Sequence, residues 1–220
     1  MAPAPMKLPR FYPIVDTGVL QSRGLPLRDA AEALLEAQVG ILQFRHKLDW
    51  TREIYEEARV ISSLCRDAHT TFVINDRADI ALLLDAAAHV GQQDLPPSQV
   101  RRVLGAERLL GYSTHNEVQL RTAITEPVDY LALGPIFGTT SKANPDPVVG
   151  VEELSRMRAL TDKPLVAIGG ITFEIAREVW AAGADAVAVV GDLYERGCSR
   201  QTVRGRAEKW MQLAQEYSAN

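Results

Sequence analysis

Eight short runs of apolar and β-branched residues recur along the chain, and they constrain its fold more than any other feature. They lie at residues 11–16, 41–46, 71–76, 89–93, 109–114, 130–135, 164–170 and 186–191. Several are apolar without a break, which is typical of parallel strands covered on both faces. Helical patterns lie between them, for example at residues 27–38, 51–68 and 172–183. Strands that alternate with helices predict a parallel sheet with crossover helices.

Eight such units within 220 residues match an α/β protein built as a single-domain (β/α)8 TIM barrel. A doubly wound open sheet is the alternative, but the chain has no natural division into halves and no linker rich in Pro, Gly and Ser. We therefore predict an N-terminal extension over residues 1–10 and one catalytic barrel domain over residues 11–220. Active sites of such barrels lie at the carboxyl ends of the strands.

The composition excludes several classes of protein. Hydrophobic residues make up 46% and charged residues 24%, as in an ordinary globular protein, and the net charge of −4 argues against a broad basic surface for nucleic acid or membranes. Two cysteines are too few for a disulfide framework or a four-cysteine metal site, and we find no signal peptide or membrane helix. We expect a cytoplasmic protein with small-molecule partners and without nucleic-acid or membrane partners. The oligomeric state stays open, a homo-oligomer included.

Two cations near the end of the second predicted strand indicate a polyanionic ligand. Gln43, Arg45 and Lys47 are spaced by two residues, so we expect their side chains on one face, directed into the barrel mouth. An arginine fork and a lysine point charge together suit a diphosphate better than a single carboxylate. A solvated strand end with an incidental ion pair is the competing interpretation.

Oxygen ligands follow the next two predicted strands. Asn75 and Asp76 end the third strand, and Asp94 follows the fourth. Two carboxylates that face each other across the mouth suit Mg²⁺, which takes one or two carboxylates together with phosphate oxygens and water. The competing interpretations are a helix N-cap for Asp76 and a turn for Asp94. The neighbouring cations favour a site for a metal and a diphosphate.

A second anion site is predicted after the last two strands. Gly169 and Gly170 permit a close approach of the backbone, and Gly191 lies where the eighth strand turns into a short helix, a frequent phosphate site in these barrels. A tight turn that needs glycine is the alternative. Asp192 fits beside a phosphate only if its side chain turns away.

The loop at about residues 136–149 carries a cluster of hydroxyl groups and one lysine, namely Thr139, Thr140, Ser141 and Lys142. It lies between the two predicted anion sites, so we expect it to bridge two substrates and to act as a lid. A flexible polar surface loop is the alternative. No set of nucleophile, base and orienting acid can be assembled from the sequence, and His89 and His115 belong to no metal-ligand spacing.

Seven ordered segments resemble the thiamine phosphate synthase family, also called thiamine-phosphate pyrophosphorylase. They are "LQFRHK", "INDRADIA", "HVGQQDLP", "GYSTHN", "DYLALGPIFGTTSK", "VAIGGI" and "AVAVVGD". The resemblance implies a transferase of thiamine biosynthesis with a (β/α)8 barrel. It would couple 4-amino-2-methyl-5-hydroxymethylpyrimidine diphosphate with 4-methyl-5-(2-phosphoethyl)thiazole, giving thiamine phosphate and diphosphate with Mg²⁺ present.

The resemblance also implies roles for individual residues. The pyrimidine diphosphate would be bound by Gln43, Arg45, Lys47, Asn75 and Lys142. Mg²⁺ would be bound by Asp76 and Asp94, and the leaving group by Ser113. The thiazole phosphate would be bound by Thr139, Ser141, Gly170, Val190 and Gly191. The residues nearest to the chemistry would be Arg45, Ser113 and Lys142. The chain departs from the family pattern at His46, where an acidic residue is usual, and at Ser141 and Gly191.

The family chemistry is a dissociative substitution, in which an electron-rich aminopyrimidine expels diphosphate and the thiazole nitrogen captures the resulting cation. The protein then needs to stabilise the departing charge and to hold both partners in line. Two alternatives remain open. A thiazole tautomerase-like barrel needs only the phosphate pocket and an acid or base such as His115, and a noncatalytic phosphate-ligand binding module needs no metal.

Overall fold

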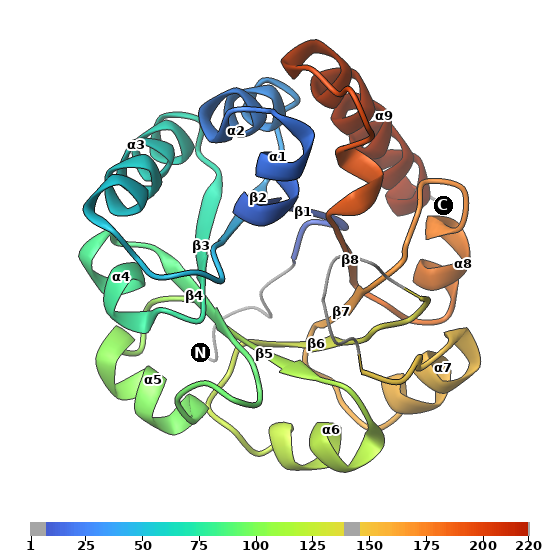
Figure 1. The fold of residues 1–220 in the computed structure, drawn as a ribbon. Helices are drawn as coiled ribbons and strands as arrows, with labels where there is room; N and C mark the ends of the chain where they lie inside the picture. Colours follow the sequence, from blue (N-terminus) through green and yellow to red (C-terminus); the bar gives the residue numbers. More distant parts are fainter. Residues whose placement is uncertain (1–7, 139–145, 220) are drawn as a thin grey trace.

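The computed structural model describes residues 8–138 and 146–219. Eight parallel strands close into a barrel in the order β1 to β8, and the helices surround it (Figure 1). The strands are β1 (Phe11–Asp16), β2 (Ile41–Arg45), β3 (Thr71–Asn75), β4 (Ala87–Val90), β5 (Leu110–Thr114), β6 (Tyr130–Leu133), β7 (Leu165–Ile168) and β8 (Ala186–Val189). The predicted (β/α)8 barrel is confirmed.

The described helices follow the strands around the outside of the barrel. They are α1 (Thr17–Arg23), α2 (Leu27–Glu36), α3 (Arg52–Asp67), α4 (Ala78–Leu83), α5 (Pro97–Leu104), α6 (Glu117–Ala123), α7 (Val151–Arg158), α8 (Ala176–Ala181) and α9 (Arg200–Ala219), and a 3-10 turn η1 (Gly191–Leu193) follows β8. Side-chain caps begin several of them. Asn116, for example, accepts a hydrogen bond from the Gln119 amide at 2.9 Å at the start of α6.

Two elements begin two or more residues away from their predicted starts. β4 begins at Ala87, ahead of the predicted run at 89–93, so His89 lies within the strand. Its first two residues are alanines, whose low strand propensity hid them. α8 begins at Ala176 rather than at residue 172, because residues 173–175 form a turn.

The core has two layers, one inside the barrel and one between the barrel and the helices. Alternate residues of each strand point inward, as Tyr12 and Ile14 do on β1, while Phe11 and Val15 point toward the helices. Leu8, from the predicted N-terminal extension, is 5% exposed and joins the inner cluster. Each fully buried large apolar side chain contributes about 1.5–3 kcal/mol.

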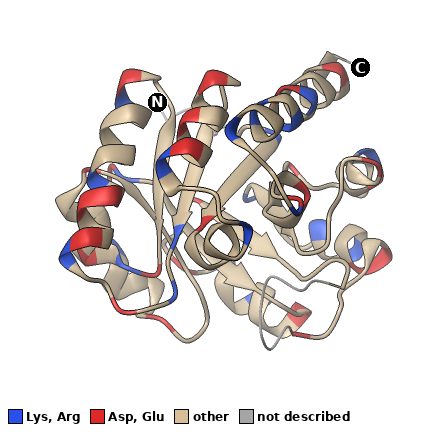
Figure 2. Cartoon of the chain, turned by 45° about the horizontal axis from the view of Figure 1, so that its top comes forward, with Lys and Arg blue, Asp and Glu red and all other residues tan. Residues whose placement is uncertain are grey.

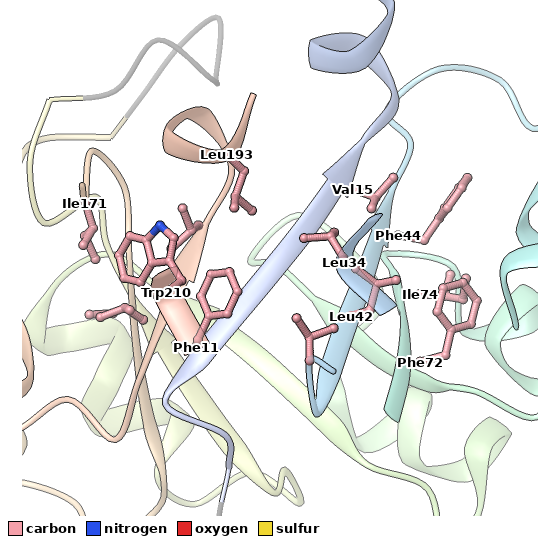
Figure 3. Packing of buried hydrophobic residues seen from close by; sticks show 14 of the residues in the cluster. Phe11, Val15, Leu34, Leu42, Phe44, Phe72, Ile74, Ile171, Leu193 and Trp210 are labelled. Carbon is pink, nitrogen blue, oxygen red and sulfur yellow. The ribbon is translucent and has the colours of Figure 1, made fainter. Parts of the chain in front are cut away.

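An aromatic cluster anchors the last helix to the barrel. Trp210 of α9 stacks on Phe11 of β1 with ring centroids 5.2 Å apart, and the edges of Phe173 and Trp180 complete the cluster. Figure 3 shows Trp210 and Phe11 together, with Ile171 and Leu193 beside them. α9 thereby packs on β1 and on the η1 turn that follows β8, where a phosphate site was predicted.

Acidic and basic residues are mixed along the outer helices (Figure 2). None of the helices in the described ranges combines the length and the apolar character that a membrane span requires.

Candidate active site

The polar residues predicted for the site gather at the carboxyl ends of β2 to β5. The strand register places Arg45 beside Asp16 and Asn75 beside His89. Because all strands run in one direction, these positions lie at the same end of the barrel, which forms the mouth of the candidate site.

Arg45 is held by a buried carboxylate that the sequence analysis did not single out. Its guanidinium forms an ion pair with Asp16, which is 4% exposed and ends the neighbouring strand β1. Asp16 also caps α1, because its Oδ1 accepts a hydrogen bond from the Val19 amide at 2.9 Å. The carboxylate therefore fixes the fork of Arg45 at the mouth and stabilises the start of α1 together.

Lys47 lies two residues beyond the end of β2, yet its ammonium reaches the next strand. Its Nζ is 2.5 Å from Oδ2 of Asp76, and Asp76 in turn neighbours the Asp94 carboxyl. Burial raises the pKa of Asp76, the Lys47 ammonium acts against this, and the Asp94 carboxyl adds to it. The predicted meeting of these carboxylates is confirmed.

The competing interpretation of Asp76 as a helix cap is wrong, because Arg77 occupies the N-cap position of α4 and no side chain caps this helix. Asp76 instead adopts a left-handed backbone with φ of 67°, a conformation that costs a non-glycine residue free energy. The turn predicted for Asp94 does exist, because its Oδ2 accepts a hydrogen bond from the Gly91 amide at 2.7 Å. Asp94 therefore orders its own loop and presents a carboxylate beside Asp76.

The charges at the mouth suit a divalent cation together with a diphosphate. Within the described ranges, the carboxylates of Asp16, Asp76 and Asp94 outnumber the cations of Arg45 and Lys47. A diphosphate alone would meet a net negative surface, whereas Mg²⁺ would make the mouth positive. The described residues contain no cluster of three acidic, His or Cys ligands. Mg²⁺ commonly takes one or two carboxylates and keeps water and phosphate oxygens among its ligands, which the neighbouring carboxyls of Asp76 and Asp94 could provide.

A chain of hydrogen bonds crosses the inside of the barrel beneath the mouth. The Gln43 amide nitrogen donates to the Tyr12 hydroxyl at 3.0 Å, and the hydroxyls of Tyr12 and Tyr130 are 2.9 Å apart. Nδ1 of His89 is 3.0 Å from the Tyr130 hydroxyl, and Nε2 is 2.8 Å from Oγ of Ser113. The chain links Gln43, predicted to contact the pyrimidine, with Ser113, predicted to contact the leaving group.

Only one direction of this chain gives every buried hydrogen in it an acceptor. The Gln43 amide nitrogen can only donate, so the Tyr12 hydroxyl accepts from it, and the Tyr12 hydrogen finds its acceptor in the Tyr130 hydroxyl. Tyr130 then donates to Nδ1 of His89, and Nε2–H of His89 donates to Ser113. The Ser113 hydroxyl keeps its hydrogen for a ligand in the mouth.

Burial keeps every member of this chain uncharged at neutral pH. It lowers the pKa of His89 to about 4 and raises the pKa of Tyr12 to about 12. Burial also raises the pKa of Tyr130 well above its ordinary value. Gly111 makes room for the chain, since a Cβ there would lie 2.1 Å from Cζ of Tyr130 and 2.4 Å from Nδ1 of His89.

Asn75 ends β3, as the sequence predicted, and the structure adds that its side chain is buried. Its amide nitrogen has no hydrogen-bond acceptor among the residues that the structure describes. A buried donor without a partner costs about 1–3 kcal/mol, and an anionic oxygen in the mouth would satisfy it.

The predicted phosphate end lies after β7 and β8. Gly170 has φ of 65°, and a Cβ there would lie 2.5 Å from the Gly138 carbonyl oxygen and 2.8 Å from Cβ of Phe137. The tight packing of the neighbouring loop is therefore sufficient to require glycine. The η1 turn starts at Gly191, and its first amides precede the hydrogen bonds within the turn. Val190 and Gly191 are thus placed at the mouth, and their role toward a phosphate stays a prediction.

The cluster of Thr139, Thr140, Ser141 and Lys142 lies outside the described residues. The chain that precedes it is fixed, because the Ile136 and Phe137 amides donate to the carbonyls of Ile168 and Gly169 at 2.9 and 3.0 Å. His46 packs toward the start of α1 and toward Trp50, with Nδ1 2.8 Å from the Thr17 hydroxyl and its ring edge-to-face with Trp50.

His115 borders the same loop, on the β5 side. Its Nδ1 is 2.6 Å from the Gly134 carbonyl oxygen and therefore carries the ring hydrogen.

Four residues of the site were missed or undervalued in the sequence: Tyr12, Asp16, His89 and Tyr130. Each is a polar residue on a predicted strand that otherwise reads as apolar. The alternation of side chains on those strands was the available signal, because it assigns Tyr12 and Asp16 to the inward face that also carries Gln43 and Arg45.

Comparisons with known proteins agree with this geometry. Residues 11–193 match the family model described as thiamine monophosphate synthase. A thiamine-phosphate synthase of Koribacter versatilis is 48% identical over 191 residues, which covers 86% of this chain and 90% of that protein. A second thiamine-phosphate synthase, from Chloroflexus aurantiacus, is 41% identical over 182 residues, covering 82% of this chain and 83% of that protein.

Solved structures place the same chain among similar barrels. A thiamine phosphate pyrophosphorylase from Pyrococcus furiosus superposes with a TM-score of 0.82 at 28% identity, covering 95% of this chain and 96% of that one. The tryptophan synthase α subunit of Legionella pneumophila has a TM-score of 0.65 at 16% identity, covering 96% of this chain and 93% of that one. That second likeness concerns the fold alone.

Proposed function

The chain belongs to the thiamine monophosphate synthase family, and we propose that it is a thiamine phosphate synthase. It joins the methylene carbon of 4-amino-2-methyl-5-hydroxymethylpyrimidine diphosphate to the ring nitrogen of 4-methyl-5-(2-phosphoethyl)thiazole. The products are thiamine phosphate and diphosphate. The protein is accordingly a transferase that acts on two small phosphorylated molecules.

The observation that carries this proposal is the meeting of Arg45, Lys47, Asp76 and Asp94 at one mouth. Two cations and two carboxylates from neighbouring strands suit a magnesium diphosphate. A tautomerase that acts on the thiazole phosphate alone would not need these four side chains, and neither would a metal-independent binding module.

The diphosphate would be bound by the side chains of Arg45, Lys47 and Asn75. Arg45 and Lys47 each already contact a carboxylate, so their positions are set before the substrate arrives. The Asn75 amide nitrogen, buried and without an acceptor in the described part of the chain, would donate to a phosphate oxygen. Lys142, predicted to reach the same group, lies outside the described residues.

Asp76 and Asp94 would hold Mg²⁺, whose charge would stabilise the departing diphosphate. The raised pKa of Asp76 fits this role, because a cation between the two carboxyls replaces repulsion with attraction. No side chain has to act as a general acid or base in this step, since the diphosphate departs as an anion.

Ser113 would donate its hydroxyl hydrogen to the oxygen of the leaving diphosphate. The bond between that oxygen and the methylene carbon breaks, and its electron pair leaves with the diphosphate. His89 positions this hydrogen, because its Nε2–H occupies the Ser113 oxygen at 2.8 Å. The Gln43 amide, which already donates to Tyr12, would present its oxygen to the amino group of the pyrimidine.

The thiazole would enter from the side of β7 and β8, with its phosphate on the backbone of Gly170, Val190 and Gly191. Thr139 and Ser141 would add hydroxyl donors from the loop. The thiazole nitrogen then supplies the electron pair of the new carbon–nitrogen bond. Because the two anions occupy opposite sides of the mouth, the reacting atoms are held in line between them.

The test is an assay of the purified chain with both substrates, in which released diphosphate and thiamine phosphate are measured with Mg²⁺ and with excess chelator. We expect one diphosphate per thiamine phosphate, and no turnover after chelation. Turnover that persists without a divalent cation would contradict the metal site, and absence of product with both substrates and Mg²⁺ would contradict the function. A cytoplasmic location and the lack of a nucleic-acid partner remain predictions.

A further inference from the structure

Asp192 follows the proposed phosphate site directly, where its negative charge would repel a phosphate unless its side chain were held elsewhere. It is the second residue of the η1 turn, directly beside the backbone proposed to bind the acceptor's phosphate. Its carboxylate turns away from the mouth and receives hydrogen bonds from two side chains of α9. Arg206 donates from Nη2 to Oδ1 at 2.6 Å and from Nε to Oδ2 at 3.0 Å, and Trp210 donates from Nε1 to Oδ2 at 2.8 Å.

These contacts form a rigid group, which we call the α9 clamp (Asp192, Arg206 and Trp210). The side chain of Asp192 is 7% exposed and pairs with both arms of the Arg206 fork, the geometry in which an arginine fixes a carboxylate in position and orientation. The Arg206 guanidinium also lies over the Phe173 ring, 5.2 Å from its centroid. The hydrogen bond from Arg206 to the Asp192 carboxylate raises the pKa of Arg206, so its guanidinium stays charged.

Trp210 ties the clamp to the core. It is fully buried and stacked on Phe11 of β1, with the edges of Phe173 and Trp180 against its ring. Figure 3 shows Leu193, the neighbour of Asp192, close to this aromatic group. A shift of Asp192 would therefore require either broken hydrogen bonds or movement of a packed aromatic cluster.

The η1 turn needs such external support. It spans only Gly191–Leu193 and is closed by the Leu193 and Tyr194 amides, which donate to the carbonyls of Val190 and Gly191 at 3.1 and 3.2 Å. One turn does not hold itself in water, and glycine at its first position adds conformational freedom. The amides that open the turn can bind a phosphate together only if their N–H groups converge on one position.

We propose that the α9 clamp positions the backbone of Val190 and Gly191 for the phosphate of the thiazole substrate and neutralises the adjacent Asp192 charge. This inference rests on the proposed function and makes Asp192, Arg206 and Trp210 positioning residues that do not touch the substrate. Without Arg206, the buried Asp192 carboxylate would keep only the Trp210 hydrogen bond, its charge beside the phosphate site would lose its counter-ion, and the turn would lose its main anchor.

The test compares steady-state kinetics of the wild type with Arg206→Met, Arg206→Lys and Trp210→Phe, varying each substrate separately. The matched control is Arg204→Met, because Arg204 lies on the same helix and pairs with the exposed carboxylates of Glu36 and Glu208. We expect Arg206→Met to raise the KM for the thiazole phosphate about tenfold to a hundredfold. The KM for the pyrimidine diphosphate and kcat should stay within about twofold, as expected for lost positioning of one substrate.

Arg206→Lys and Trp210→Phe should raise the same KM less, since each keeps part of the clamp, and Arg204→Met should leave it unchanged. Trp210→Phe keeps the aromatic packing, so it stays informative even if Arg206→Met fails to fold. Unchanged KM values in the folded clamp variants, or an equal rise in the KM of both substrates, would overturn the clamp while leaving the synthase assignment intact. A wild type without coupling activity would instead refute the proposed function.

Discussion

His89 offers the sharpest quantitative prediction, because its pKa separates the folded from the unfolded chain. Burial lowers that pKa from the ordinary 6.5 to about 4. Between these two pH values the unfolded chain binds a proton at His89 that the folded protein excludes. The free energy of unfolding therefore falls as the pH drops through this window.

The magnitude follows from the width of the window. At about 1.4 kcal/mol per pH unit, the interval from 6.5 to about 4 corresponds to about 3 kcal/mol. The loss should begin just below pH 7 and level off below pH 4, where both states bind the proton. For a domain whose total stability is about 5–15 kcal/mol, this effect is large.

The assay is denaturant unfolding at a series of pH values for the wild type, His89→Gln and the control His69→Gln. His89→Gln cannot bind the proton, so its stability should fall by about 3 kcal/mol less than that of the wild type between pH 7 and 4. The carboxylates contribute equally to all three proteins and cancel in the comparison. His69 is exposed, so its variant should follow the wild type. Equal pH slopes for the wild type and His89→Gln would refute the conclusion that burial keeps His89 neutral.

Three further predictions test the site. Asp76→Asn should lower the coupling rate by about a hundredfold or more and weaken the dependence of the rate on Mg²⁺. The matched control Asp79→Asn, which loses an exposed ion pair with Arg77, should retain the wild-type kcat. Equal rates in both variants would contradict the metal site. Ser113→Ala should lower kcat about a hundredfold with little change in either KM. Steady-state kinetics and single-turnover release of diphosphate measure this effect, and a defect confined to KM would argue against a role of Ser113 in departure of the leaving group. Gly111→Ala should lower the free energy of unfolding by about 1–3 kcal/mol and reduce activity, because its Cβ collides with Tyr130 and His89. Gly205→Ala on α9, where a Cβ meets nothing within 4 Å, should raise the free energy of unfolding by about 0.5–1 kcal/mol. Thermal unfolding measures both, and a stable, active Gly111→Ala protein would show that the buried hydrogen-bond chain has more room than the structure gives it.

The sequence was most informative where a local pattern repeats. Unbroken apolar runs such as "AVAVVG" need cover on both faces, and eight short strand-like runs separated by helical patterns leave few folds other than a closed barrel. The errors occurred where the local signal was weak. The strand β4 starts with two alanines, and the start of α8 is a turn built from residues with ordinary helix propensity.

For the candidate site, the residue types were predictable but their partners were not. Arg45, Lys47, Asp76 and Asp94 were assigned to the mouth because they follow consecutive predicted strands. The pairing of Arg45 with Asp16 depends on the register between β1 and β2, which no local pattern specifies.

The sequence by itself determined the strand period, the class of fold, the end of the barrel that carries the site, and the kinds of charge gathered there. These properties depend on neighbours along the chain. Only the tertiary structure decided that Gln43, Tyr12, Tyr130, His89 and Ser113 form one directed chain of hydrogen bonds. It alone placed Asp192 against Arg206 and Trp210. Closure of the barrel brings together residues more than a hundred positions apart, such as Tyr12 and Tyr130, and hydrogen bonds form where atoms meet in space.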